Sequence, residues 1–203
     1  MSADLIVLVP DADIEWTINT LLAKRHQALR IRPISFKIIR HPMRDNGVFN
    51  NPLPFLAPYL PQTEQALVIL DREGSGQEGQ KSATEMETEL AEKLQQCWTA
   101  ARICAIVLDP ELEVWVWSPS PHMAAVLGVS PEVLQQIKAG FPLIDNGKPQ
   151  RPKEAMLAVL QQSKRPFSAR IFQELAERVS LNSNERAFDK LRATLQQWFP
   201  LEY

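Results

Sequence analysis

The first half of the chain alternates short, continuous apolar runs with segments whose apolar residues recur at helical spacing. A continuous apolar run suits a strand that is covered on both faces, as in a parallel sheet. Residues 5–9 form such a run, and further strands are expected at residues 34–39, 66–70 and 102–108. Amphipathic helices are expected at residues 13–25 and 82–96. Strands that alternate with helices predict an α/β fold with a mostly parallel sheet flanked by helices.

Two segments of the first half have a weaker pattern. Residues 41–63 are rich in Pro, Asn and Gly, which predicts a long loop with one short helix over residues 54–59. The segment "DPELEVWVWS" is ambiguous, because its alternating Val and Trp would suit a strand. Asp109 as N-cap and Pro110 in the first turn favour a helix instead.

From residue 119 onward the strand pattern disappears. Five segments have the spacing of short helices, and several of them begin with Ser, Pro or Asn at the capping position. They are "PHMAAVLG", "SPEVLQQIKAG", "RPKEAMLAVLQQ", "SARIFQELAERV" and "NERAFDKLRATLQQWF". We therefore expect an α/β domain over residues 1–118 and a helical C-terminal extension over residues 119–203.

Length and composition predict a globular protein with a proper core. The chain has 203 residues, 45% of them hydrophobic, and a net charge of −2. Its longest apolar runs are too short to cross a bilayer, and no basic segment followed by an apolar one begins it. We therefore expect a cytoplasmic protein with no membrane partner. Cys97 and Cys104 belong to no CxxC pair or Cys/His array and are expected to be reduced and inert.

The charge is distributed unevenly between the two halves. Residues 1–118 carry 11 Lys and Arg against 16 Asp and Glu, whereas residues 119–203 carry 11 against 8. The basic excess of the second half is well below that of a dedicated nucleic-acid binder. Charge therefore permits nucleic-acid binding without arguing for it.

Carboxylates follow each of the four expected strands. In parallel sheets ligands bind beyond the carboxyl ends of the strands, so these side chains are expected at one edge of the sheet. In strand order they are Asp11 and Asp13, then Asp45, then Asp71 and Glu73, and finally Asp109, Glu111 and Glu113.

Like charges gathered at one edge repel each other unless a cation neutralises them. Mg²⁺ is usually held by one or two carboxylates together with waters and substrate phosphates. Asp71 and Glu73 are the strongest local candidates, because Gly74 and Gly76 allow a close backbone approach. Each acid taken alone has a simpler interpretation as a helix cap or loop residue, and Asp11 lies where a cap is expected.

The order of these acidic motifs resembles that of Toprim-like domains. The segments are "LVPDADIEWTINTLL", "VILDREG" and "DPELEVW", and they are most similar to an uncharacterised bacterial Toprim-related family with a Glu-x-Trp element, here Glu113 and Trp115. "RPKEA" and the terminal "AFDKLRATLQQWF" resemble the C-terminal helices of that family. The resemblance implies a Toprim-like, Rossmann-like sheet and Mg²⁺-dependent chemistry at phosphodiesters. It also implies nucleic-acid processing or phage defence as the setting, with a partner ATPase.

The chain departs from the family pattern at one position. The usual motif has a Glu directly after the first strand, where it acts as general acid or base, and this chain has Pro10 there. Asp11, Asp13 or Glu15 would have to act from a shifted position, and a displacement of ~1 Å can cost ~100-fold in rate. The departure bears on catalysis more than on the fold.

Further candidates lie near the same edge. His41 and Arg44 follow the second strand and would suit proton transfer and phosphate binding, although a polar loop explains them as well. Arg151 and Lys153 could contact phosphates from the helical half, or simply be solvated. His122 is expected at a helix start. Trp115 and Trp117 are expected in the core or at an interface, because no basic cluster adjoins them.

These observations lead to two hypotheses. The first is a nuclease-like Mg²⁺- or Mn²⁺-dependent phosphodiester hydrolase, and the second is a non-catalytic regulatory or scaffolding subunit that has lost its general base. A homodimer is compatible with either hypothesis.

The sequence lacks the P-loop, Rossmann glycine, GxSxG and HExxH motifs of other enzyme classes. In the first hypothesis the metal ligands are Asp71, Glu73, Glu111 and Glu113, the catalytic residues are Asp11, Glu15, His41 and Arg44, and the substrate-binding residues are Arg151 and Lys153.

Overall fold

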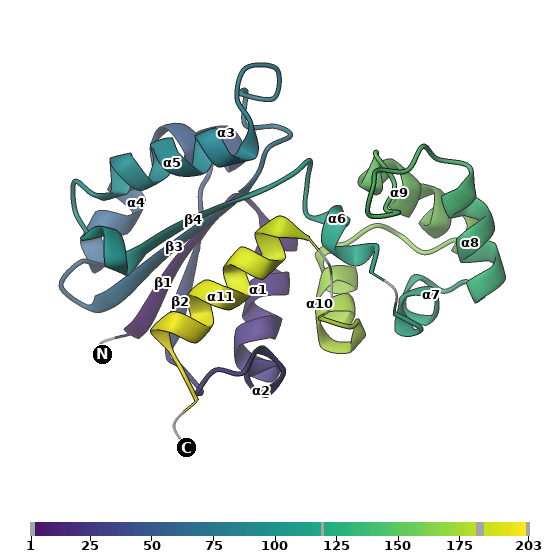
Figure 1. The fold of residues 1–203 in the computed structure, drawn as a ribbon. Helices are drawn as coiled ribbons and strands as arrows, with labels where there is room; N and C mark the ends of the chain where they lie inside the picture. The colour runs from purple at the N-terminus through teal and green to yellow at the C-terminus, as the bar shows by residue number, and fades with distance from the viewer. Residues whose placement is uncertain (1–2, 119, 182–184, 202–203) are drawn as a thin grey trace.

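A four-stranded, all-parallel sheet forms the centre of the molecule (Figure 1). The computed structural model describes residues 3–118, 120–181 and 185–201. The strand order is β2-β1-β3-β4. The strands are β1 (Ala3–Val9), β2 (Phe36–Arg40), β3 (Thr63–Asp71) and β4 (Ile103–Leu108). The predicted α/β fold, with four parallel strands and helices around them, is confirmed.

Alternate residues of each strand face opposite sides of the sheet, and both sides are covered. Leu5, Val7 and Val9 belong to one core, and Ile6 and Leu8 belong to the other. In register, Leu5 lies beside Phe36 of β2 and Gln65 of β3. The continuous apolar runs of β1, β3 and β4 are therefore buried on both faces, whereas β2 is partly exposed.

One face of the sheet is covered by α3 (Arg44–Asn50), α4 (Leu53–Leu56) and α5 (Ala83–Leu94). A capping box between Ser82 and Glu85 begins α5, because each side chain accepts a hydrogen bond from the backbone N–H of the other. The prediction of a long loop over residues 41–63 is wrong at α3. Val48 and Phe49 are buried there, so tertiary packing of this short helix outweighs the local Pro, Asn and Gly content.

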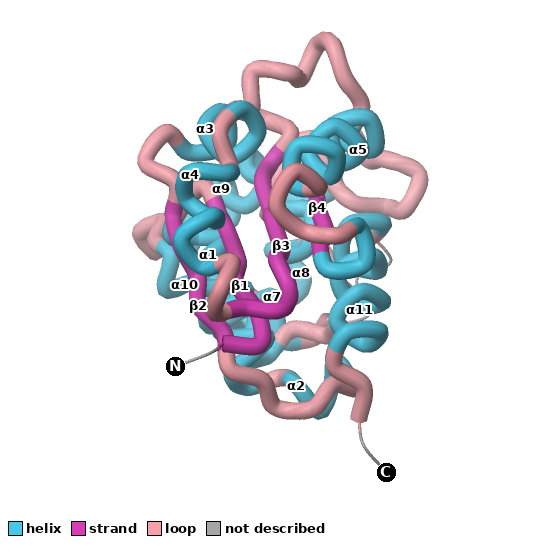
Figure 2. The backbone as a smooth tube through the Cα atoms, turned by 90° about the vertical axis from the view of Figure 1, so that its left-hand side faces the viewer, coloured by secondary structure: helices cyan, strands magenta, loops and turns pink. Residues whose placement is uncertain are grey.

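The other face is covered by helices from both ends of the chain. These are α1 (Ala12–Lys24), the short α2 (His26–Leu29), α10 (Ala169–Arg178) and α11 (Arg186–Trp198). In both Figure 1 and Figure 2, α11 lies alongside β4. The last two helices therefore share one core with the sheet.

Between these elements the chain makes a helical lobe, on the right in Figure 1. It consists of α7 (His122–Leu127), α8 (Pro131–Ala139) and α9 (Pro152–Ser163), and α6 (Glu113–Val116) leads into it from β4. All five predicted C-terminal helices are present. Asn184, the expected cap of the last one, lies outside the described residues, and Glu185 is the observed N-cap. The division of the chain near residue 118 stays a prediction.

The segment after β4 is helical, as favoured by the sequence, but the helix is short and begins late. Asp109 does not cap it, because α6 starts at Glu113 after Leu112. Asp109 instead forms an ion pair with Arg72, with Nε and Oδ1 2.9 Å apart. Trp115 and Trp117 are buried, as expected.

A buried carboxylate joins α11 to the sheet. Glu87 of α5 accepts hydrogen bonds from Arg186 and Lys190 of α11 and from the backbone N–H of Val107 in β4. Arg186 also donates to the carbonyl of Val107 at 2.7 Å. These bonds occupy the outer edge of β4 at Val107.

In the described part of the chain no helix is long and apolar enough to cross a bilayer.

Because α11 shares its core with the strands, we expect Leu191→Ala to destabilise the whole protein. Leu191 is 1% exposed, so its truncation should lower the free energy of unfolding by about 3 kcal/mol. Urea denaturation followed by circular dichroism should retain a single transition. The control is Leu157→Ala at a 42% exposed leucine of α9, with an expected loss below about 0.5 kcal/mol. A separate early transition for Leu191→Ala would contradict a shared core.

Candidate functional site

The carboxyl ends of β1 and β3 define the crevice in which a ligand is expected. The helices that follow these adjacent strands, α1 and α5, leave toward opposite faces of the sheet. Such a divergence opens a crevice at the strand ends. Asp11 stands after β1, and Asp71 is the last residue of β3. Figure 1 shows this end of the sheet directed toward α3 and α6.

Asp71 is a buried acid at the centre of the crevice. The residue is only 8% exposed, and no described residue makes a hydrogen bond to its Oδ1. The backbone N–H of Asp71 donates to Oδ1 of Asp45 at 2.8 Å, which brings the acid of α3 against the end of β3. The pKa of Asp71 is raised well above its usual range by burial, and then by the charges of Asp45 and Glu113.

The second pair of acids comes from the segment after β4. Glu113 is 2% exposed, and Glu111 is partly buried. Lys153 of α9 lies between them, with Nζ 3.5 Å from Glu113 Oε1 and 3.6 Å from Glu111 Oε2. The backbone N–H of Lys153 also donates to Glu111. The lysine is thus the ammonium group that partly neutralises this side of the crevice.

Three buried hydrogen bonds place α6 and α9 so that these groups meet. The indole N–H of Trp115 donates to Glu185, the N-cap residue of α11, at 2.7 Å. The indole N–H of Trp117 donates to the carbonyl of Pro152, which opens α9, at 2.9 Å. Lys148 Nζ donates to the carbonyl of Val114 at 2.9 Å. The aromatic residues around Glu113 therefore hold Lys153 beside it.

The two acids after β1 have different surroundings. Asp11 is the N-cap of α1, and its Oδ1 accepts hydrogen bonds from the N–H groups of Asp13 and Ile14. This cap stabilises the helix start and keeps a carboxylate at the crevice. Asp13 is half-buried, and burial followed by the charge of Asp11 raises its pKa to about 6.

The pKa values of Asp45, Glu111 and Glu113 are also raised. Burial raises the pKa of Asp45 to about 6, with the Asp11 charge adding to the effect and the bond from the Asp71 N–H opposing it. Burial also raises the pKa of Glu113 to about 7 and that of Glu111 above its usual value. Burial lowers the pKa of Lys153, but Glu113 and Glu111 outweigh it and the net shift is upward. The crevice therefore holds more negative charge than it can neutralise.

Three predicted acids lie outside this cluster. Glu73, a predicted metal ligand, is exposed beyond the end of β3. Asp109 pairs with Arg72, and Glu15, a predicted catalytic residue, pairs with Arg40 at 2.9 Å. The structure thus brings together at least one carboxylate from each strand end, but not all of the carboxylates that were predicted there.

His41 and Arg44 take different positions. The His41 ring packs against Phe55, with centroids 4.2 Å apart, and its Nδ1 accepts a hydrogen bond from the Met43 N–H. Burial lowers its pKa, so the imidazole is neutral. Gly47 is required beside it, because a Cβ there would come within 2.1 Å of the ring. Arg44 is exposed, and its side chain makes no ion pair with a described residue.

The remaining predicted residues are also placed. Arg151 is exposed and pairs with Glu154 one turn along α9 at 3.3 Å, so of the two predicted substrate-binding residues only Lys153 reaches the acids. Pro10 is buried directly after β1. It offers no side-chain proton donor or acceptor where the resemblance places a Glu.

Two cavities open on either side of Lys153 and share it as a lining residue. The first, called the Arg44 cavity here, has a volume of about 670 Å³ and is lined by Pro10, Asp11, Ala12, Asp13, Arg40, His41, Pro42, Arg44, Lys153 and Phe167. The second, the Glu73 cavity, has about 560 Å³ and is lined by Glu73, Pro110, Glu111, Gln150, Arg151, Pro152, Lys153 and Glu154. Both volumes suit a small ligand or one unit of a polymer.

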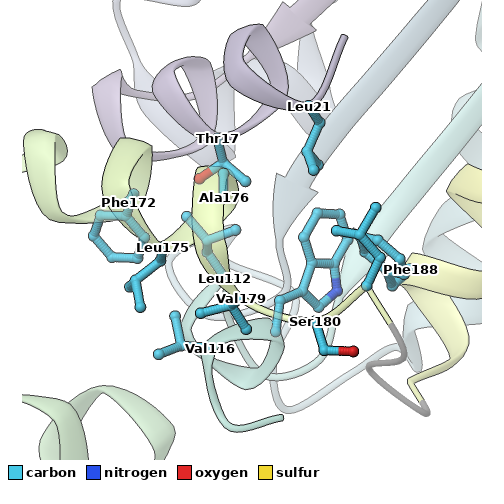
Figure 3. Close-up of a pocket in the computed structure, with 12 residues that line it drawn as sticks. Thr17, Leu21, Leu112, Val116, Phe172, Leu175, Ala176, Val179, Ser180 and Phe188 are labelled. Carbon is cyan, nitrogen blue, oxygen red and sulfur yellow. The ribbon is translucent and has the colours of Figure 1, made fainter. Parts of the chain in front are cut away.

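A third, apolar cavity is separate from the crevice (Figure 3). It has a volume of about 50 Å³ and lies where α1, α6 and α10 meet. Leu112, Phe172 and Leu175 point into it in the close-up, and none of its lining residues is titratable. It is a packing gap between helices without groups for catalysis.

The acidic cluster fits a hydrated cation better than a fully protein-ligated one. Within residues 3–118, 120–181 and 185–201, no three His, Cys, Asp or Glu side chains are placed to hold one ion together. Mg²⁺, however, keeps several waters and commonly needs only one or two carboxylates. The unpartnered, buried Oδ1 of Asp71 is a ligand of the required kind, and Asp45 and Glu113 stand near it.

The predicted site does not include Asp45, although the strand-end pattern contained the signal. Asp45 follows β2 by only five residues. Its importance depends on α3, which turns its carboxylate toward the N–H of Asp71. A loop prediction for residues 41–63 could not supply that orientation.

We expect stability without divalent cations to fall as the pH rises from about 5 to about 7.5. Folding raises the carboxyl pKa values to about 6 for Asp13 and Asp45 and to about 7 for Glu113, so the native state binds more protons than the unfolded chain in this range. Stability then decreases with increasing pH. Thermal unfolding in EDTA should give a midpoint several degrees lower at the upper end of the range.

The variant Asp71→Asn removes one buried carboxyl group while keeping the shape of the side chain. It should unfold at a higher temperature than the wild type at neutral pH, and its midpoint should depend less on pH. Asp109→Asn, at an exposed and paired acid, should keep the wild-type pH dependence. A wild-type midpoint that rises over this pH range would contradict the repulsion described above.

Comparison with known proteins gives no match: no family model, curated protein or solved structure matches the chain. Its function is therefore argued from the chemistry of the crevice.

Proposed function

We propose that the protein is a divalent-cation-dependent phosphodiester hydrolase that acts on nucleic acid. The observation that carries the proposal is the buried Asp71 carboxylate, which has an oxygen that no described residue binds and which lies near acids from the other strand ends. Buried like charges cost stability and are retained mainly where a site uses them. The acidic-motif order supports the same chemistry through its resemblance to Toprim-like domains.

Mg²⁺ or Mn²⁺ would be held by Asp71 and Asp45, with Glu113 close by. A cation there would supply Lewis-acid polarisation of a phosphodiester and lower the pKa of a water. Lys153 adds a protein cation at the same place and would attract a non-bridging phosphate oxygen. Asp11 contributes charge while fixing the start of α1, so the helix holds the edge of the site in place.

A second candidate function is that of a non-catalytic regulatory or scaffolding subunit of a larger complex, beside a partner ATPase. Two observations favour it. Pro10 provides no general acid or base after β1, and Lys153 already compensates part of the charge of Glu111 and Glu113. In that case the acids would be held by the lysine, and no metal would be needed.

Isothermal titration calorimetry with Mg²⁺ and with Mn²⁺ separates the two candidates. We expect the wild type to bind, and Asp71→Asn to lose most of the affinity because its buried ligand oxygen is lost. A saturating cation should also raise the unfolding midpoint, with about 2.7 kcal/mol of stabilisation at 100 times the Kd. Asp109→Asn should bind as the wild type does. Absence of uptake by the wild type would support the scaffolding candidate.

Cleavage is tested next with single- and double-stranded DNA and RNA in Mn²⁺. We expect the wild type to cut at least one of them and Asp71→Asn to be slower by about 100-fold or more, since the cation would be lost or misplaced. Glu73→Gln is the matched control for an exposed acid of the same strand end and should keep most of the activity. Cation binding without cleavage of any of these substrates would contradict the nuclease assignment.

A further inference from the structure

The two cavities that meet at Lys153 differ in charge. In the Arg44 cavity three cations, Arg40, Arg44 and Lys153, face the carboxylates of Asp11 and Asp13. In the Glu73 cavity two cations face three carboxylates. Of these two cavities, the Arg44 cavity is the one whose lining holds more cationic side chains than carboxylates.

Arg44 is the cation of this cavity that makes no ion pair with a described residue, although its charge partly offsets the rise in the pKa of Asp13. Arg40 is paired with Glu15 and Lys153 with Glu111 and Glu113, whereas Arg44 makes no ion pair with a described residue. Its guanidinium presents several N–H donors in a planar fork that matches phosphate oxygens. Its backbone has φ of 49°, so an arginine is held in the left-handed region at the start of α3.

An aromatic ring lines the same cavity. Phe167 is 36% exposed and lies between α9 and α10. Its orientation is fixed by an edge contact with Phe172, with centroids 5.6 Å apart. Arg165, two residues earlier, donates to Glu174 of α10 at 2.8 Å and to the carbonyl of Val126. The ring is therefore on an anchored loop.

An aromatic ring and an arginine without an ion pair to a described residue line the same cavity, and this combination suits a nucleotide. Aromatic rings stack on bases that are not paired in a duplex, and arginine binds the attached phosphate. The volume of about 670 Å³ lies within the range of small-ligand sites. Lys153 borders both this cavity and the carboxylates, so a phosphate bound here lies next to the proposed cation site.

We propose that the Arg44 cavity binds one unpaired nucleotide unit, with its phosphate at Arg44 and its base against Phe167. The inference deepens the proposed function and rests on it for the neighbouring chemistry: the substrate is single-stranded or has an unpaired nucleotide at the crevice. The same unit could arrive as part of a strand or as a free nucleoside monophosphate.

Binding is tested by fluorescence anisotropy in EDTA, where no cleavage occurs. The probes are a fluorescein-labelled single-stranded oligonucleotide and a blunt duplex of the same sequence, with a nucleoside monophosphate as competitor. We expect the single strand to bind more tightly than the duplex. Phe167→Leu should weaken the single-strand Kd by about tenfold, whereas Phe167→Tyr keeps the ring and should bind normally.

Arg44→Gln should also weaken single-strand binding by about tenfold and reduce the slope of log K against log salt by about one. Its matched control is Arg30→Gln. Arg30 is also an exposed arginine with a positive φ, of 60°. It precedes β2 and therefore lies at the amino end of the strands, away from the crevice. That variant should bind as the wild type does. Unchanged unfolding midpoints verify that each variant is folded.

Weaker binding of either the single strand or the monophosphate by Phe167→Leu and Arg44→Gln supports the inference. Equal binding of single strand and duplex, together with insensitivity of both ligands to these two variants, would overturn it. The result is independent of cation calorimetry. If the protein binds nucleotide but takes up no metal, the hydrolase proposal fails and the nucleotide site stands. If it takes up metal but nucleotide affinity does not change in Phe167→Leu and Arg44→Gln, the nucleotide site fails and the hydrolase proposal stands.

Discussion

Electrostatic repulsion among buried carboxylates is the constraint on which the rest of this structure depends. A parallel sheet directs all its strand ends to one edge, and here each strand end delivers an acid to that edge. Asp71 is buried, with one oxygen unpartnered by any described residue, and burial followed by the charges of Asp45 and Glu113 raises its pKa. Such a cluster lowers stability, and a bound cation would reverse the effect.

The helical half of the chain is needed to hold this edge in place. Trp115 and Trp117 follow Glu113, in α6 and at its C-cap, and their indole N–H groups donate to the carboxylate of Glu185 and to the carbonyl of Pro152. The second of these bonds brings the start of α9, and with it Lys153, to the acids. The lysine that partly neutralises the crevice thus comes from a segment far along the chain. Fold and site are therefore coupled through α6.

The sheet could be predicted from sequence because its strands are continuous apolar runs and its helices have clear periodicity. The convergence of Asp11, Asp71 and Glu113 followed from the parallel topology. The individual roles did not follow, because they depend on side-chain direction and on partners distant in sequence. Pattern alone could not separate Glu73 from Asp71, since the two stand two residues apart and only Asp71 is still within the buried strand.

The central claim is tested most directly by carboxyl ¹³C NMR titration of Asp71, assigned with the Asp71→Asn variant. Without divalent cations, the carboxyl group should ionise well above its usual pH range because of burial and the neighbouring Asp45 and Glu113. Adding Mg²⁺ should shift that ionisation to lower pH, since the cation favours the charged form. An ordinary pKa for Asp71, or a titration unchanged by Mg²⁺ and Mn²⁺, would contradict the account.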